Sequence, residues 1–252
     1  MKKILYTLII ALSATLGLKA QVSDGESINY RVMYKWGLVN KQAGRVNLST
    51  QRTDAQTIKA QLTARTEKWA DAFYSVRDTL LGSMNIFTME PAYYEKITHE
   101  GGEYKRDLIT YTRNGGHVTA NCQRWKQKSK KKPVTKSEIT LEADGLTLDM
   151  LSSFYYMRSL DYATMNPGDK KELTVFSGRR KETLAITYLG KENVEIKDEI
   201  FPAYKISFTF TGEGGKKTSD DMWAWISADS DHIPLKLEGK LPVGKVQCFY
   251  VK

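Results

Sequence analysis

Cysteine, histidine and the common catalytic motifs are scarce in this sequence. It contains only two cysteines and three histidines among 252 residues. These side chains are scattered, without the close spacing of Cys and His that a zinc site needs. A Gly-x-Ser-x-Gly nucleophile elbow and a glycine-rich phosphate loop are absent as well. The sequence therefore predicts no catalytic residue, no metal and no cofactor.

Apolar runs long enough to cross a bilayer are also lacking. The longest, residues 4–16, has about 13 residues, short of the ~18–20 that a membrane-spanning helix needs. It follows two lysines and is followed by a small residue, Ala20, which is the pattern of a cleavable signal peptide. We expect residues 1–20 to be removed before Gln21. With no cysteine near the cut, the mature protein is expected to be soluble, periplasmic or extracellular, and not lipid-anchored.

Acidic residues are missing from residues 124–136, which we call the basic arm. The formal net charge of +9 falls to about +6 without the three signal-peptide lysines, and the arm alone supplies seven positive charges. Genomic nucleic acid is a poor partner for an exported protein. An anionic membrane surface or an acidic envelope glycan is a better one, and a solvated hairpin tip without a partner is the alternative. The charged residues of the arm are Arg124, Lys126, Lys128, Lys130, Lys131, Lys132 and Lys136.

Alternation of apolar and polar residues is the main signal in the rest of the chain. Residues 28–34 and 204–210 alternate with period two, as half-buried strands do. Short turns rich in Gly, Asn, Asp and Pro separate many of these segments, so neighbouring strands are expected to be antiparallel. Further strands are expected at 42–50, 56–66, 77–86, 92–99, 103–113, 116–125, 136–142, 171–177, 182–189, 192–197, 221–228, 233–239 and 243–251.

One segment, residues 147–161, has helical periodicity instead. Leu148, Leu151 and Tyr155 form an apolar stripe, which we expect to pack against the sheet. Asp144 or Thr147 is expected to cap the helix start. Residues 67–73 predict a second, weaker helix.

The two cysteines follow apolar residues at period two, so both thiols are expected to face the core. An exported protein can form disulfides, but buried cysteine also packs as a small hydrophobe. The sequence leaves both a Cys122–Cys248 disulfide and two free thiols open.

Several landmarks occur in a recognisable order along the chain. Gly25-Glu26 precedes the first strand, residues 149–158 read DMLSSFYYMR, a hairpin runs from Trp225 to Pro234, and Gly244 lies in the last turn. This order resembles the DUF3108 family of exported bacterial proteins of unknown function. The leader resembles those of Bacteroidetes exports.

The resemblance implies a mainly β fold with a large, curved antiparallel sheet, a half-barrel or open barrel broadly like lipoprotein carriers. It implies one domain over residues 21–252, with two halves joined through the helix at about 147–161. It transfers no catalytic residue, because the family has no assigned activity.

Three charged residues and five aromatic residues are the candidate site residues. Asp78, Asp149 and Arg158 lie in apolar surroundings and are expected to be buried, paired and structural. Adjacent aromatic residues on a strand face opposite sides of the sheet, so some of them are available to line a ligand groove. The candidates for ligand binding are Trp36, Tyr74, Tyr94, Tyr156 and Trp225.

The sequence thus favours a non-enzymatic envelope protein that binds an amphipathic ligand, such as a lipid or a lipid-linked glycan, or a protein partner on a curved sheet. A structural or interaction protein without a small-molecule pocket is the alternative, and an unrecognised glycan-acting enzyme is a third hypothesis.

Overall fold

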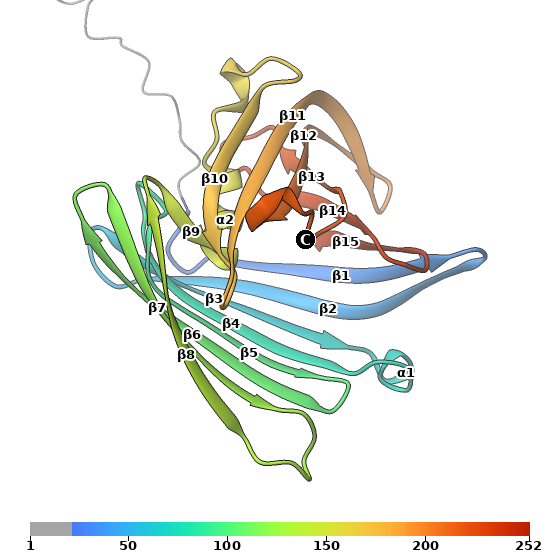
Figure 1. Ribbon diagram of the computed structural model, residues 1–252. Coiled ribbons are helices and arrows are strands. Elements are labelled where there is room, and N and C mark those ends of the chain that lie inside the picture. The colour runs from blue at the N-terminus through green and yellow to red at the C-terminus, as the bar shows by residue number, and fades with distance from the viewer. Residues whose placement is uncertain (1–21) are drawn as a thin grey trace, which may run out of the picture.

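The computed structural model describes residues 22–252, so the predicted signal peptide and its cleavage site lie outside the described residues. Within them, all fifteen strands form one sheet, in the order β8-β7-β6-β5-β4-β3-β2-β1-β15-β14-β13-β12-β11-β10-β9. Figure 1 shows this sheet curving strongly, so that its two ends approach each other and α2 lies between them. The predicted mainly β, open-barrel fold is confirmed.

The elements follow the alternating pattern of the sequence, except that the two strands expected at 182–189 and 192–197 are one strand, β11, with a register shift between Tyr188 and Gly190. The first eight strands are β1 (Ser27–Trp36), β2 (Val39–Arg52), β3 (Thr57–Thr66), β4 (Val76–Asn85), β5 (Pro91–Glu100), β6 (Glu103–Asn114), β7 (His117–Gln127) and β8 (Thr135–Asp144). The remaining strands are β9 (Thr147–Asp149), β10 (Lys170–Phe176), β11 (Lys181–Ile196), β12 (Glu199–Gly212), β13 (Met222–Ser227), β14 (Pro234–Lys240) and β15 (Lys245–Val251). The helices are α1 (Lys68–Asp71) and α2 (Met150–Arg158), with 3-10 turns η2 (Tyr162–Thr164) and η3 (Glu213–Gly215).

Neighbouring strands are antiparallel, except that β9 runs parallel to β10. The first strand pairs with the last, from Asn29 opposite Val251 to Lys35 opposite Lys245. Because the strands run up and down, successive turns alternate between two rims of the sheet. The α1 rim holds the turns β1–β2, β3–β4, β5–β6, β7–β8, β12–β13 and β14–β15, whereas the β10–β11 turn lies inside the curved sheet, where Gly178 contacts Asp107 and Arg124. The opposite rim holds the other turns, including the α2–β10 connection and residues 22–26.

Helix α2 fills the interior of the curved sheet and contacts β4, β9 and β10. Leu151 packs on β4 where Gly82 leaves room for it: a Cβ at Gly82 would lie 3.1 Å from Leu151 Cδ2. Leu148, Leu151 and Tyr155 are all buried, with exposed fractions of 1% or less. The expected packing of this stripe against the sheet is therefore present.

The start of the helix differs from the sequence expectation. Residues 147–149 pair with β10 as the short strand β9, and α2 begins only at Met150. Asp149, not Asp144 or Thr147, is the N-cap, and its side chain accepts hydrogen bonds from the backbone N–H groups of Leu151 and Ser152. Three extended residues are too short to show strand periodicity, which is why the pattern placed them in the helix.

The two ends of the sheet, β8 and β9, are joined by the short link of residues 145–146 and by side-chain contacts, not by strand pairing. Lys181 Nζ donates to the Glu142 carbonyl at 2.9 Å, and Arg179 Nη1 donates to Ser137 Oγ at 3.1 Å. Both contacts connect the β10–β11 end to β8, the strand at the far edge of the sheet. The barrel is therefore nearly closed without a continuous ring of backbone hydrogen bonds.

The buried helix gives a direct test of this core. Leu151→Ala is expected to lower the free energy of unfolding by ~2–5 kcal/mol, because it leaves a cavity between α2 and β4. Leu38→Ala is the matched control: Leu38 is fully exposed, so the change should stay within ~0.5 kcal/mol. Chemical denaturation measures both, and equal stability of the two variants would mean that Leu151 is not buried.

Candidate functional site

An apolar groove of about 710 Å³ opens on the inner face of the sheet at the α1 rim. Its floor is formed by β1, β2, β3 and β15, and its far wall by β4 and the α1 loop. Most of its lining is aliphatic or aromatic, and the volume falls within the roughly 300–1,000 Å³ of ligand sites. The apolar side chains that line it are Val32, Tyr34, Trp36, Val39, Ala43, Val46, Ala64, Trp69, Ala70, Phe73, Tyr74, Val76, Leu241, Val246 and Cys248.

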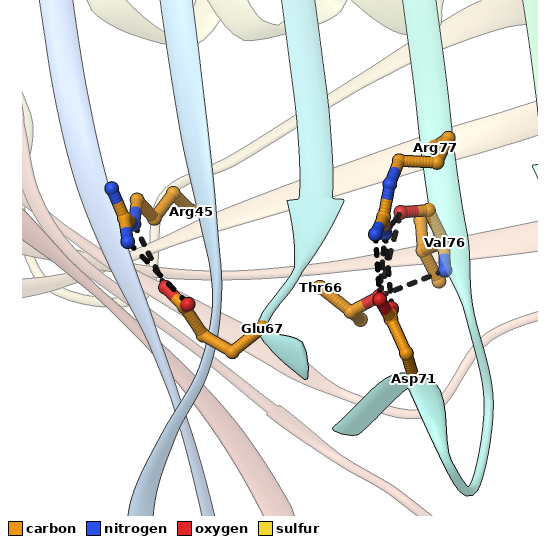
Figure 2. Close-up of polar contacts among 6 residues, drawn as sticks. All are labelled: Arg45, Thr66, Glu67, Asp71, Val76 and Arg77. Carbon is orange, nitrogen blue, oxygen red and sulfur yellow. Dashed lines mark hydrogen bonds and ion pairs between the residues drawn. The ribbon is translucent and has the colours of Figure 1, made fainter. Parts of the chain in front are cut away.

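The α1 loop (residues 67–75) is held over the groove by an ion pair on each side. Glu67 pairs with Arg45 of β2 at 2.8 Å, and Asp71 pairs with Arg77 of β4 at 2.6 Å (Figure 2). The Thr66 hydroxyl donates to Asp71 and accepts from the Val76 N–H. Hydrogen bonds from Arg77 and Thr66 lower the pKa of Asp71 to about 2. The loop is thus fixed to the strands that flank it.

Two aromatic side chains of the α1 loop, Trp69 and Phe73, line the groove. Trp69 Nε1 donates to the Gln42 carbonyl at 2.6 Å, and Lys41 Nζ lies 4.7 Å from the centre of the Trp69 ring. Phe73 packs edge-on against Trp69 but keeps 83% of its surface exposed.

The β14–β15 turn closes the opposite side of the groove. Gly244 has a positive φ of 78°, and a Cβ there would clash with the Lys35 carbonyl and lie 3.0 Å from Trp36 Cβ. Tyr34 Oη donates to the Val243 carbonyl at 3.1 Å. Only glycine allows the last turn to approach the end of β1 this closely.

A polar strip adjoins the groove on the inner face of the sheet. Asp78 pairs in register with Ala64, which lines the groove, and Glu100 pairs with Val76, which also lines it. Tyr74 spans the boundary: its ring lines the groove, and its hydroxyl donates to Glu100 at 3.1 Å. The apolar and polar surfaces are therefore continuous.

Two lysines on this face lack an acidic partner. Lys96 pairs in register with Leu80 and Asp107, and Lys105 pairs with Thr98, so both project from the inner face. Both are half-buried, and neither forms an ion pair within the described residues, whereas the nearby Asp107 is bound by Arg124 at 2.5 Å. Without a direct ion pair, both lysines still act through their charges on Glu100, whose pKa they help to lower.

The carboxyl groups of Asp78 and Glu100 affect each other's ionisation. Burial, and then the hydrogen bond with Glu100, raise the pKa of Asp78 to about 6. Although burial opposes the shift, hydrogen bonds from Asp78 and Tyr74 lower the pKa of Glu100. When both groups are ionised, Asp78 Oδ1 is buried without a partner; when protonated, Asp78 can donate to Glu100. The negative charge of the strip therefore decreases as the pH falls through about 6.

The five predicted aromatic residues lie in four different places. Trp36 and Tyr74 both line the apolar groove. Tyr156 lines a second pocket, of about 650 Å³, at the opposite rim. Tyr94 is fully buried in the main core, and Trp225 is buried in a small separate cluster between β11 and β14. The structure thus brings two of the five together.

The predicted structural charges Asp149 and Arg158 lie at the two ends of α2. Both are fully buried, and burial raises the pKa of Asp149 to about 7. Arg158 forms two hydrogen bonds with Glu26, at 2.6 and 2.7 Å, and donates to the backbone carbonyls of Asp231 and His232. Asp78, in contrast, is half-buried and borders the groove.

The basic arm is divided between strands and a turn. Arg124 and Lys126 belong to β7 and pair with Asp107 and Glu103, at 2.5 and 3.1 Å. Lys136 belongs to β8, with its Nζ 5.2 Å from the centre of the Trp125 ring. The remaining four lysines, Lys128, Lys130, Lys131 and Lys132, are exposed in the β7–β8 turn at the α1 rim.

The two cysteines are both free. Cys122 faces the core beside β6, and Cys248 lines the apolar groove. Burial raises the pKa of each thiol to about 11. Of the two alternatives that the sequence left open, the structure has the unpaired thiols.

Residues 22–252 contain neither a candidate metal site nor a helix that could span a membrane. No group of three or more His, Cys, Asp or Glu side chains is placed to hold a metal ion. No helix in this range has both the length and the apolar character of a bilayer-spanning helix.

The sequence did not reveal the groove as a unit. Its lining comes from three hairpins that are far apart in the chain, and many of its residues are small, such as Ala43 and Ala64. The pair Trp69 and Phe73 was the detectable signal, because aromatic side chains in a short polar loop are unusual.

Comparison with known proteins gives a family and a fold. The model of the family DUF3108, protein of unknown function, matches residues 29–249, and the chain belongs to this family. No curated protein matches the chain.

Two solved structures are similar. One is a β-barrel-like Brucella abortus protein of the domain of unknown function DUF1849: it is 12% identical with a TM-score of 0.62, over 92% of this chain and 98% of that one. The other is from Bacteroides fragilis and is named as a candidate exported protein with a YmcC-like fold: it is 6% identical with a TM-score of 0.39, over 92% and 98% of the two chains. The first similarity shows the fold alone.

The thiol chemistry of the folded protein can be measured directly. With a pKa of about 11, about one thiol in ten thousand is ionised at pH 7. We expect both cysteines to react very slowly with Ellman's reagent in the native protein and rapidly after unfolding in urea without reductant. Two titratable thiols per unfolded chain are expected, and a count of zero would mean that a Cys122–Cys248 disulfide forms.

Proposed function

We propose that this DUF3108 domain is a non-enzymatic binding protein for an anionic amphipathic ligand. The acyl chain lies in the apolar groove, and the charged headgroup lies on the adjoining strip near Lys96 and Lys105. The observation that carries this proposal is the register between the two surfaces, which places Asp78 beside Ala64 and Glu100 beside Val76.

The lining of the groove favours a hydrocarbon chain over a sugar or peptide. The side chains that face it are almost all aliphatic or aromatic, so they offer few hydrogen bonds to a polar ligand. Burying apolar surface contributes roughly 25 cal/mol per Å², and each methylene of a chain adds to the affinity without requiring a polar partner.

The polar strip favours a negatively charged headgroup. Lys96 and Lys105 are half-buried, so a bound anion would be partly desolvated, and charge-assisted hydrogen bonds are stronger there than in water. Asp78 and Glu100 oppose an anion when both are ionised. Their linked ionisation therefore gives the site a dependence on pH.

Export of the protein to the periplasm or beyond, expected from the leader, would place this site where lipids and lipid-linked glycans of the envelope are present. The shared chemistry of these candidates is an acyl chain joined to an anionic headgroup.

Filling the groove is the first test. Ala64→Trp places an indole among the lining residues and is expected to lower the affinity for fluorescent (nitrobenzoxadiazole) lysophosphatidylglycerol by at least ~10-fold. Val246→Trp fills the same space from β15, and it replaces Ala64→Trp in the test if that variant is unstable. Ala55→Trp, an exposed position in the β2–β3 turn at the opposite rim, is the matched control. Circular dichroism and thermal melts establish that each variant folds.

Either of two results would contradict the groove as a lipid site. One is wild-type affinity in both filled variants. The other is no binding by the wild type, which would favour an interaction protein without a small-molecule pocket.

The pH dependence is the second test. The pKa of Asp78 is raised to about 6, so protonation below pH 6 removes one negative charge beside the lysines. Binding of lysophosphatidylglycerol, whose phosphodiester stays ionised, should be about three- to tenfold tighter at pH 5 than at pH 7.5. Asp78→Asn should bind with nearly the same affinity at both values.

Two comparisons sharpen this test. An uncharged monoacylglycerol with the same chain should show no such pH dependence in the wild type. Replacing both Lys96 and Lys105 with Gln should weaken binding of the charged ligand by ~10-fold or more and leave the uncharged ligand unaffected. An unchanged pH profile in Asp78→Asn would rule out this carboxyl as the titrating group.

A further inference from the structure

Apolar side chains that do not line the groove protrude from the α1 rim. Leu38, at the tip of the β1–β2 hairpin, is fully exposed, and Val243, in the β14–β15 turn, is 51% exposed. Neither belongs to the groove lining, so a ligand in the groove would not cover them. Phe73, 83% exposed in the α1 loop, and Trp36 lie at the same rim. Three separate turns thus present apolar tips to solvent at one end of the molecule.

The charges of the chain are polarised between the two rims. The turns of the α1 rim contain seven Lys or Arg and five Asp or Glu. The turns of the opposite rim, together with residues 22–26, contain one Lys or Arg and nine Asp or Glu. Two acids at each rim are paired with arginines: Glu67 and Asp71 at the α1 rim, and Glu26 and Glu90 at the opposite rim. The largest basic contribution is the β7–β8 turn, in which the four lysines of residues 128–132 are exposed.

We propose that the α1 rim docks on the surface of an anionic lipid bilayer. The apolar tips insert among the headgroups and upper acyl chains, while the lysines contact lipid phosphates. Tryptophan and exposed aliphatic residues suit this interfacial depth, and each lysine near an anionic surface adds to the attraction. The acidic opposite rim is repelled by the same surface, so the charge distribution also sets the orientation.

Charge argues against a second copy of this chain as the occupant. An isologous dimer through the α1 rim would bring two basic surfaces together, which is unfavourable at physiological ionic strength. A bilayer containing anionic lipid supplies both the apolar medium and the opposite charge. Docking does not require a ligand in the groove, although the groove opens at the same rim and would face the lipid.

Vesicle flotation of the full mature chain tests the proposal. We expect the wild type to float with vesicles of three parts phosphatidylcholine to one part phosphatidylglycerol, and much less with phosphatidylcholine alone. Leu38→Ser combined with Val243→Ser should lower the partition coefficient by ~10-fold or more. Replacing Lys130, Lys131 and Lys132 with Gln should lower it similarly and reduce its dependence on salt.

Ile200→Ser is the matched control. Ile200 is 68% exposed and follows the β11–β12 turn at the opposite rim, so its replacement should leave flotation unchanged. The groove-filling Ala64→Trp variant should still float, which separates docking from ligand binding. The proposal is overturned if the wild type does not float with anionic vesicles, if the Leu38 and Val243 variant floats equally well, or if Ile200→Ser loses as much. Light scattering that shows a dimer dissociated by the tip substitutions, without flotation, would assign the rim to self-association instead.

Discussion

The buried guanidinium of Arg158 is the interaction on which the arrangement of the barrel depends. Its exposed fraction is 1%, and it joins three parts of the chain: the end of α2, Glu26 before β1, and the carbonyls of the β13–β14 turn. The ring Nδ1 of His232 donates a hydrogen bond to the Arg158 carbonyl at 2.8 Å. Removing one partner of a buried ion pair costs roughly 3–5 kcal/mol, so these segments are strongly coupled. The helix is thereby fixed inside a sheet whose two edge strands do not pair with each other.

That fixed helix divides the interior into regions with different properties. Beside α2 the inner face is filled by side chains such as Leu151 and Tyr155. Toward the α1 rim α2 no longer covers the strands, and the same apolar face continues as the open groove. Farther round the sheet, from β4 to β7, the inner positions near the α1 rim become charged, from Asp78 to Arg124. An amphipathic interior follows from one helix that is too short to cover the whole curved sheet.

The two rims of the sheet differ in charge. An up-and-down sheet places alternate turns on opposite rims, so the composition of alternate turns sets the charge of each rim. Here the lysine-rich β7–β8 turn and the apolar tips fall on one rim, and most acidic turns fall on the other. The difference in charge between the two rims therefore follows from the up-and-down topology and from the sequences of the turns.

The sequence by itself determined the strands, because period-two alternation is a local property that a half-buried sheet imposes on each segment. It also determined the existence of α2 and the basic character of residues 124–136, and the order of its landmarks indicated the DUF3108 family. It misplaced the start of α2, because three-residue β9 is too short for any pattern. Only the tertiary structure decided that Arg158 contacts Glu26, 132 positions away in the chain. It also decided that Trp36 and Tyr74 line one groove, whereas Tyr94 and Trp225 are buried elsewhere. The two cysteines remain unpaired for the same reason. These outcomes depend on curvature and strand register, which bring distant residues together and leave no periodic trace in the chain.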